Sequence, residues 1–341
     1  MKKFFGIVCL STFLLLACGK KESTPAAVAP TNLTVTAVVS TDNSGNVSFT
    51  ATATNASNYE FDYGNGIYQI VPSGSVTYKY PASGTYTVNV IAKSSTGQTI
   101  SKSIQVTVAV TLSLVFQDEF DTPGTPDPAK WSYDLGTGSG GWGNNELQYY
   151  TNRLENSSVS NGTLKITAIR ENFSGAAFTS ARLVSQNKYS FKYGKVEARA
   201  KLPIGVGTWP AIWMLGNNIS TTSWPACGEI DIMEHVGAQQ NKIFGTLHYP
   251  GKSGGNADGG TTIVPDASTA FHIYSVEWNA ASIKIFVDGN LFHTYVNSAS
   301  SPFNQNFFFI LNVAMGGNFG GPVEAGFTKS TLEIDYLRVY Q

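Results

Sequence analysis

The chain has 341 residues, of which 13% are charged, and its formal net charge at pH 7 is −1. A charge this close to zero argues against a nucleic-acid partner and against a membrane surface bound through charge alone. The length allows two or three domains, and the abundance of glycine (34), tyrosine (16) and phenylalanine (20) favours an all-β protein with many turns.

Residues 1–18 have the pattern of a signal peptide. Lys2 and Lys3 precede an apolar run, residues 4–16, that is too short to span a membrane. The end of this run resembles the bacterial lipobox, which implies cleavage before Cys18, lipid on that cysteine and a protein anchored in the bacterial cell envelope. The alternative is an ordinary secretory signal with an incidental cysteine, and therefore a secreted protein.

A flexible tether and a small domain are expected next. Residues 19–30 are rich in Lys, Ser, Pro and Ala, as in a tether. Residues 31–110 alternate apolar and polar side chains in short runs between turn signals, which predicts a small β-sandwich. The motif at 61–66 resembles the polycystic-kidney-disease (PKD) type of immunoglobulin-like module, which usually acts as a spacer. A sugar-binding platform is the alternative, built from the tyrosines Tyr59, Tyr63, Tyr68, Tyr78 and Tyr80.

Residues 111–341 carry strand patterns throughout. Residues 194–202 and 332–340 alternate strictly, and residues 282–295 read as a hairpin that turns at Asp288-Gly289-Asn290. About 230 residues of this kind fit a two-sheet β-sandwich or jelly roll. Cys227 is the only cysteine outside the signal segment, so no disulfide is expected in the mature protein.

The acidic stretch 229–234 holds three carboxylates in six residues and reads as a strand. Strict alternation puts Glu229 and Asp231 on one face but turns Glu234 into the core, where an unpaired carboxylate costs several kcal/mol. A one-residue β-bulge near Met233 would return Glu234 to the face of the other two acids. Mutual repulsion should raise at least one pKa, which suits acid catalysis of glycoside hydrolysis. The alternative is a solvated strand face with ordinary surface acids.

Aromatic and amide residues surround this strand in the sequence. Trp209 and Trp213 lie upstream, and Trp142 and Asn144 stand in a Gly-rich loop. A groove for sugars needs flat rings with polar groups at its rim. The acidic strand therefore looks like part of a sugar site.

At this point the chain resembles glycoside hydrolase family 16 in its bulged, laminarinase-type form. The motifs that match, besides residues 229–234, are residues 142–151, 180–183, 193–199, 207–215, 245–249 and 312–317. The resemblance implies a concanavalin-like jelly roll with a sugar groove, and a retaining endo-hydrolase of β-glucans. It assigns the nucleophile to Glu229, the acid/base to Glu234 and a tuning role to Asp231.

The resemblance also implies substrate contacts. They fall on Trp209, Trp213, Trp142, Asn144, Arg182 and His248. For two of these a structural role is the alternative: a surface ion pair for Arg182 and strand packing for His248. Many family members place a tryptophan or tyrosine where this chain has Phe319. Phenylalanine keeps the ring but lacks the N–H or O–H group, so one polar contact with the sugar is in doubt.

No metal is expected in catalysis. The motif His-Glu-x-x-His is absent and the chain has only four histidines. The resemblance implies a structural calcium away from the groove, with Glu119, Gly162 and Asp335 at matching positions. The alternative is that both acids are ordinary strand-end residues.

The sequence therefore predicts a monomeric, lipid-anchored endo-β-1,3-glucanase that acts on laminarin-like chains, with mixed β-1,3-1,4-glucan as a further substrate. One alternative is a hydrolase of an algal galactan, agar or carrageenan, on the same fold. The other is a non-catalytic glucan-binding lipoprotein.

Overall fold

The structure is a computed structural model, and it describes residues 28–341. The predicted signal peptide, its lipidation site Cys18 and most of the tether lie outside the described residues. Within residues 28–341, no helix has the length and apolar character needed to cross a membrane.

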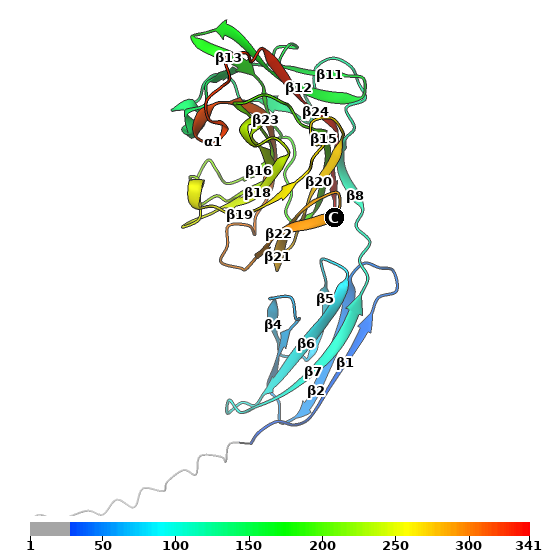
Figure 1. The fold of residues 1–341 in the computed structure, drawn as a ribbon. Helices are drawn as coiled ribbons and strands as arrows, with labels where there is room; N and C mark the ends of the chain where they lie inside the picture. The colour runs from blue at the N-terminus through cyan, green and yellow to red at the C-terminus, as the bar shows by residue number, and fades with distance from the viewer. Residues whose placement is uncertain (1–27) are drawn as a thin grey trace, which may run out of the picture.

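The first unit of the described chain is a small sandwich of two antiparallel sheets (Figure 1). Apolar and polar side chains alternate along these strands. In residues 46–54, for example, Val47, Phe49 and Ala51 are buried between the sheets. One sheet contains β1 (Thr31–Val39), β2 (Asn46–Thr54) and β5 (Ser75–Lys79), and the other contains β3 (Asn58–Asp62), β4 (Tyr68–Val71), β6 (Gly84–Lys93) and β7 (Thr99–Val108).

The tyrosines of this unit do not form a sugar platform. Tyr59, Tyr63 and Tyr80 are buried in its core. Tyr78 is half-buried and stacks on Tyr63 with ring centroids 3.8 Å apart. Only Tyr68, 76% exposed, presents its ring to solvent. The platform hypothesis was wrong because the alternating pattern turns most of these rings toward the opposite sheet.

The second unit is a larger sandwich of a ten-stranded and a seven-stranded sheet. The ten-stranded sheet contains β8 (Leu114–Asp118), β10 (Gln148–Tyr150), β11 (Ser157–Ser160), β12 (Thr163–Phe173), β13 (Ala176–Ser180), β15 (Gly194–Lys201), β20 (His272–Trp278), β21 (Ser282–Val287), β22 (Asn290–Val296) and β24 (Lys329–Tyr340). The seven-stranded sheet has the order β19 (Asp258–Ile263), β18 (Lys242–His248), β17 (Glu229–His235), β16 (Thr208–Gly216), β23 (Phe307–Met315), β14 (Arg182–Val184) and β9 (Ser132–Tyr133).

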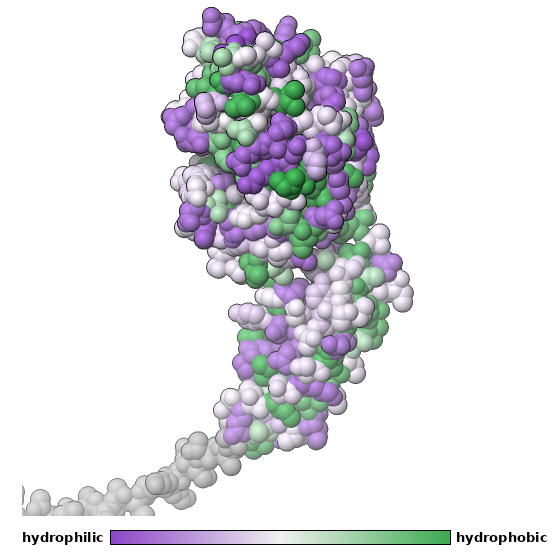
Figure 2. All heavy atoms as spheres, viewed as in Figure 1, coloured by the Kyte–Doolittle hydropathy of each residue, from purple (hydrophilic) through white to green (hydrophobic). Residues whose placement is uncertain are grey.

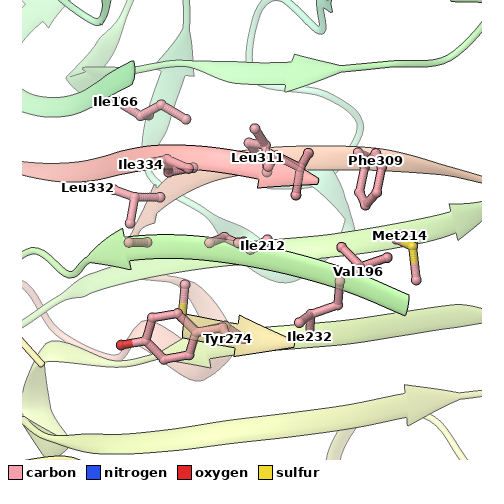
Figure 3. Packing of buried hydrophobic residues seen from close by; sticks show 14 of the residues in the cluster. Ile166, Val196, Ile212, Met214, Ile232, Tyr274, Phe309, Leu311, Leu332 and Ile334 are labelled. Atoms are coloured by element: carbon pink, nitrogen blue, oxygen red, sulfur yellow. The ribbon is translucent and has the colours of Figure 1, made fainter. Parts of the chain in front are cut away.

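One continuous core fills the space between these two sheets. Ile212 and Ile232 of the seven-stranded sheet pack in the same cluster as Val196 and Tyr274 of the ten-stranded sheet (Figure 3). The only helical segments in the described part are short: a π-turn at Gly141–Asn145, 3-10 turns at Gly237–Gln239 and Gly254–Asn256, and α1 (Gly317–Gly320). The prediction of an all-β jelly-roll sandwich is confirmed.

The chain passes from the small unit to the large one through residues 109–113. Ser113 and the last residue, Gln341, exchange two backbone hydrogen bonds of 2.8 and 2.9 Å. These bonds continue the antiparallel pairing of β8 with β24, in which Leu114 lies opposite Tyr340. The first and last strands of the large unit therefore lie side by side in one sheet.

Candidate active site

Strand β17 carries a β-bulge that gathers its three acids on one face. Asp231 pairs with Trp213 of β16 and Met233 pairs with the preceding Ile212, so Ile232 is an extra residue. Ile232 and Met233 both point into the core. The residue that follows them, Glu234, is thereby returned to the face of Glu229 and Asp231. The predicted bulge is confirmed.

Glu229 lies at the start of β17 and is held by two side chains. Trp224 donates its indole N–H to Oε2 of Glu229 over 2.9 Å. His248, at the end of β18, places Nε2 3.6 Å from Oε1. Trp224 was missing from the predicted site, although it stands five residues before Glu229, and the residue is 44% exposed. An exposed ring that touches the carboxylate can also contact a sugar.

The hydrogen bonds of His248 fix its tautomer. The backbone N–H of Gly254 donates to Nδ1 over 3.2 Å, so in the neutral ring the proton sits on Nε2. That Nε2 lies 3.2 Å from Oδ2 of Asp231. Imidazoles that bind metals usually donate through the other ring nitrogen, and here that nitrogen accepts. Glu229, Asp231 and His248 are the only described residues grouped closely enough to hold a metal, and this tautomer does not suit them for it.

Glu234 is held from the opposite side. Trp209 donates its indole N–H to Oε1 over 3.0 Å, and the Thr246 hydroxyl donates to Oε2 over 3.3 Å. The Trp209 ring meets Phe319 edge to face at 5.5 Å, and Phe319 meets Phe244 in the same way at 5.0 Å. Phe319 thus packs against the ring that binds Glu234.

Burial raises the pKa of all three acids. For Glu229 and Asp231 the pKa lies well above its usual value, first because of desolvation and then because of a neighbouring carboxylate. For Glu234 desolvation also raises the pKa, and the bonds from Trp209 and Thr246 oppose the rise. Three carboxyls in so dry a site cannot all be charged at neutral pH. At least one of the three carboxyl groups therefore carries a proton at neutral pH.

Three of the predicted substrate contacts, Arg182, Trp142 and Trp213, lie against one another. The Arg182 guanidinium lies over two rings, 4.6 Å from the centroid of Trp142 and 4.9 Å from that of Trp213. Its Nε donates to Asp134 over 2.9 Å. Arg182 therefore forms an ion pair, the alternative that its sequence position left open, and it also packs on two of the predicted rings. Its contact with substrate stays a prediction.

Asn312 and Glu146, which were not among the predicted site residues, form hydrogen bonds beside Trp213 and Asn144. Asn312 accepts the indole N–H of Trp213 over 2.8 Å and donates to the Tyr150 hydroxyl over 3.0 Å. The Tyr150 hydroxyl donates to Glu146 over 3.1 Å, and Asn144 lies 3.5 Å from the same carboxylate. Glu146 and Asn312 both belong to motifs that were noticed, but neither was assigned a role from the sequence.

The site residues form a row that crosses the strands. Arg182 of β14 pairs with Asn312 of β23, Trp213 of β16 pairs with Asp231 of β17, and Asp231 pairs with Thr246 of β18. A polymer that contacts all of these residues must lie across the seven-stranded sheet rather than along a strand.

The candidate calcium ligands are engaged elsewhere. Both carboxylate oxygens of Glu119 accept from Arg338, over 2.8 and 2.7 Å, and these bonds lower the pKa of Glu119. Asp335 pairs with Arg199. Since each carboxylate is already neutralised by an arginine, this arrangement does not fit a calcium ion, and calcium binding at Gly162 and these acids stays a prediction.

Comparisons with known proteins agree with this geometry. The model of the family described as "Glycosyl hydrolases family 16" matches residues 144–338. A second model, described as "Beta-glucan synthesis-associated protein SKN1/KRE6/Sbg1", matches residues 49–229. The chain is 46% identical to the "Beta-glucanase" of Rhodothermus marinus over 244 residues, which are 67% of this chain and 85% of that protein.

Solved structures match the same part of the chain. The laminarinase from Rhodothermus marinus aligns with a TM-score of 0.65 and 46% identity over 68% of this chain and 98% of that one. A LamA variant from Z. galactanivorans, in complex with laminaritriose and laminaritetraose, aligns with a TM-score of 0.63 and 47% identity over 67% and 99% of the two chains.

Proposed function

The chain belongs to glycosyl hydrolase family 16 and is a glycoside hydrolase of β-glucans, and we propose that it cuts β-1,3-glucan chains internally with retention of configuration. The observation that carries the proposal is the bulge at Ile232, which places Glu229, Asp231 and Glu234 on one face. Retaining hydrolysis needs two carboxyl groups in different protonation states on either side of the scissile bond.

Glu229 is the nucleophile in this proposal. Its side chain is 15% exposed, against 4% for Asp231, so its charge is the better solvated of the two. It also accepts the Trp224 N–H and faces the Nε2–H of His248. Asp231 retains its proton and can share it with the nucleophile. The Glu229 carboxylate attacks the anomeric carbon, and the bond from that carbon to the leaving oxygen breaks.

Glu234 is the acid and then the base. Desolvation raises its pKa, which favours the protonated form that an acid needs. It gives its proton to the leaving oxygen in the first step. In the second step it removes a proton from water, the water oxygen attacks the anomeric carbon, and the bond to Glu229 breaks. Both displacements invert that carbon, so the configuration is retained overall.

Product analysis tests the substrate and the stereochemistry. Protein without the signal segment is incubated with laminarin, lichenan, agarose and carrageenan, while oligosaccharide sizes and the anomeric proton signals are followed. We expect short β-1,3 oligomers that appear first as the β-anomer. Initial α-anomers would contradict retention, and activity only on agarose or carrageenan would favour a galactan hydrolase.

A nucleophile variant separates an enzyme from a binder. We expect Glu229→Ser to bind laminari-oligosaccharides in calorimetry while cleavage falls below detection. If the intact protein binds laminarin and cuts none of the four polysaccharides, the non-catalytic glucan-binding function replaces the hydrolase.

We also propose a monomer held in the bacterial cell envelope by lipid on Cys18, with residues 31–110 as a PKD-like spacer. The lipobox resemblance and the buried tyrosines of the small unit support this organisation. Labelled fatty acid should be incorporated into the wild type and not into Cys18→Ser. Release of the wild type into the medium without label would favour secretion.

A further inference from the structure

Four side chains, Trp213, Asn312, Tyr150 and Glu146, form a continuous series of hydrogen bonds, which we name the Glu146 network. The indole N–H of Trp213 donates to Oδ1 of Asn312 over 2.8 Å, and Nδ2 of Asn312 donates to the Tyr150 hydroxyl over 3.0 Å. The Tyr150 hydroxyl donates in turn to Oε2 of Glu146 over 3.1 Å. Asn312 is 5% exposed and Tyr150 is fully buried, so these bonds lie away from water. The network connects a ring of the predicted groove to a carboxylate that the proposed mechanism does not use.

The direction of these hydrogen bonds is fixed at both ends. The indole nitrogen of Trp213 can only donate, and the carboxylate of Glu146 can only accept. The amide of Asn312 must therefore turn its oxygen toward Trp213 and its nitrogen toward Tyr150. Buried hydrogen bonds that run in one direction also polarise and strengthen one another. The acceptor at Glu146 thus determines how the Asn312 oxygen is presented to the indole N–H.

The backbone around Glu146 is held against the end of β23. The N–H of Leu147 donates to the carbonyl of Met315 over 2.9 Å, and the N–H of Met315 donates to Oε1 of Gln148 over 2.7 Å. Gln148 is fully buried, and its Nε2 donates to Oε2 of Glu146 over 2.7 Å. The Glu146 side chain is therefore held by the protein itself, before any substrate binds.

Two more of the predicted substrate contacts lie close to the same carboxylate. Nδ2 of Asn144 lies 3.5 Å from Oε1 of Glu146. Desolvation raises the pKa of Glu146, and the bond from Gln148 and the charge of Arg182 oppose the rise. The Arg182 guanidinium also lies 4.9 Å from the ring centroid of Trp213. The ring that the network holds by its edge is therefore covered on its face by Arg182.

We propose that Glu146 is a positioning residue, which fixes the orientation of the Trp213 ring through Tyr150 and Asn312 and so sets how tightly the groove binds a glucan. This inference rests on the proposed function, in which Trp213 contacts the sugar. A sugar that stacks on an indole needs the ring in one orientation, and a ring that is free to turn loses conformational entropy when the sugar binds. Loss of the network should therefore weaken binding more than it slows the chemical step.

Matched substitutions break or keep the network. Tyr150→Phe removes the hydroxyl and keeps the ring, and Glu146→Met removes the acceptor but keeps a side chain of similar length. Glu146→Gln still offers an acceptor oxygen to the Tyr150 hydroxyl, so this conservative variant should restore what Glu146→Met loses. Tyr149→Phe removes a hydroxyl from the neighbouring position of β10, whose ring packs against Phe173 instead of the network.

The indole N–H of Trp213 reports on the network without any substrate. The six tryptophans are labelled with ¹⁵N, and the signal that Trp213→Phe removes from the NMR spectrum is that of Trp213. We expect this signal to shift, and its proton to exchange faster with water, in Tyr150→Phe and Glu146→Met but not in Glu146→Gln or Tyr149→Phe. A signal that stays in place in both breaking variants would overturn the inference.

Affinity and kinetics test the consequence for the substrate. We expect KM for laminarihexaose to rise about five-fold in Tyr150→Phe while kcat stays within about two-fold, which is a usual effect of one lost hydrogen bond on binding. Calorimetric affinity, measured with Glu229→Ser added, should fall by the same factor. In the Trp213→Phe background, Tyr150→Phe should change the affinity no further, because the network acts through that ring.

Two outcomes would leave Glu146 and Tyr150 as structural residues only and overturn the inference. One is an equal loss of affinity from Tyr150→Phe with and without Trp213, and the other is a loss confined to kcat. If the wild type neither bound nor cut laminarihexaose, the proposed function would fail, and the Trp213 signal alone would decide whether Glu146 positions the ring.

Discussion

The indole Nε1 of Trp209 lies 3.0 Å from Oε1 of Glu234, which makes an aromatic ring the nearest donor to the proposed acid. A hydrogen bond to a carboxylate favours its charged form, so this contact lowers a pKa that burial raises. The pKa of Glu234 therefore depends on where the ring of Trp209 is held.

Replacing Trp209 with phenylalanine should move the alkaline limb of the pH profile. The variant keeps a ring but loses the N–H donor, so the pKa of Glu234 rises and the acid stays protonated to higher pH. We expect the alkaline limb of kcat/KM to shift upward and kcat/KM to fall at least ten-fold. An alkaline limb that stays in place or shifts downward would show that the indole does not tune Glu234.

Phe319 should support Glu234 through Trp209. Phe319→Leu removes the edge-to-face contact, and aromatic pairs are worth about 0.5–1.5 kcal/mol beyond the area that they bury. We expect a free energy of unfolding lower by about 1 kcal/mol and a several-fold loss of kcat. Phe319→Tyr keeps the ring and should retain both quantities. Equal losses in the two variants would assign the effect to something other than the ring.

His248 should control the acid limb of the profile. Its Nε2 faces Glu229 and lowers the pKa of that carboxyl, and the same nitrogen lies 3.2 Å from Asp231. In His248→Asn the pKa of Glu229 rises, so the nucleophile is charged only at higher pH and the acid limb of kcat/KM should move upward. The kcat at neutral pH should fall by about 10²-fold, a usual loss for a proton-bearing active-site group. Full activity with an unshifted limb would make His248 a packing residue only.

His235 should make the fold sensitive to mild acid. Its ring is fully buried, and neither nitrogen has a partner among residues 28–341, so burial lowers its pKa to about 4. The unfolded chain, with a histidine pKa of about 6.5, binds this proton first, so stability is complete above that pH and falls as the pH drops toward 4. This one group should cost about 2 kcal/mol at pH 5 relative to pH 7.

Urea unfolding at pH 7 and pH 5 measures this cost, with His235→Phe as the comparison. The variant fills the same space without a titrating group, so its loss of stability between the two pH values should be smaller than that of the wild type. The same loss in both proteins would place the pH sensitivity in other groups.

Much of the fold, and the face of β17 that carries the three acids, could be predicted because both depend on patterns between neighbouring residues in the sequence. The alternation of Ile230 and Ile232 with acids fixes the faces of β17, and the conflict at Glu234 itself indicated the bulge. Contacts between distant segments could not be predicted. Asn312 gains its role only because β23 lies beside β16, and Glu119 meets Arg338 only because β8 pairs with β24.

The pairing of Ser113 with Gln341 also has a mechanical consequence. Any tension on the chain ahead of Ser113 enters the large unit through β8, which runs on from the small unit toward the larger sandwich (Figure 1). Beside β8, β24 runs antiparallel and carries the C-terminus, and the surface around this junction mixes polar and apolar side chains (Figure 2). A pull along β8 loads its ladder of hydrogen bonds together, in shear. A lengthwise pull on the chain should therefore stretch the connecting segment before it disturbs the strands that carry the acids.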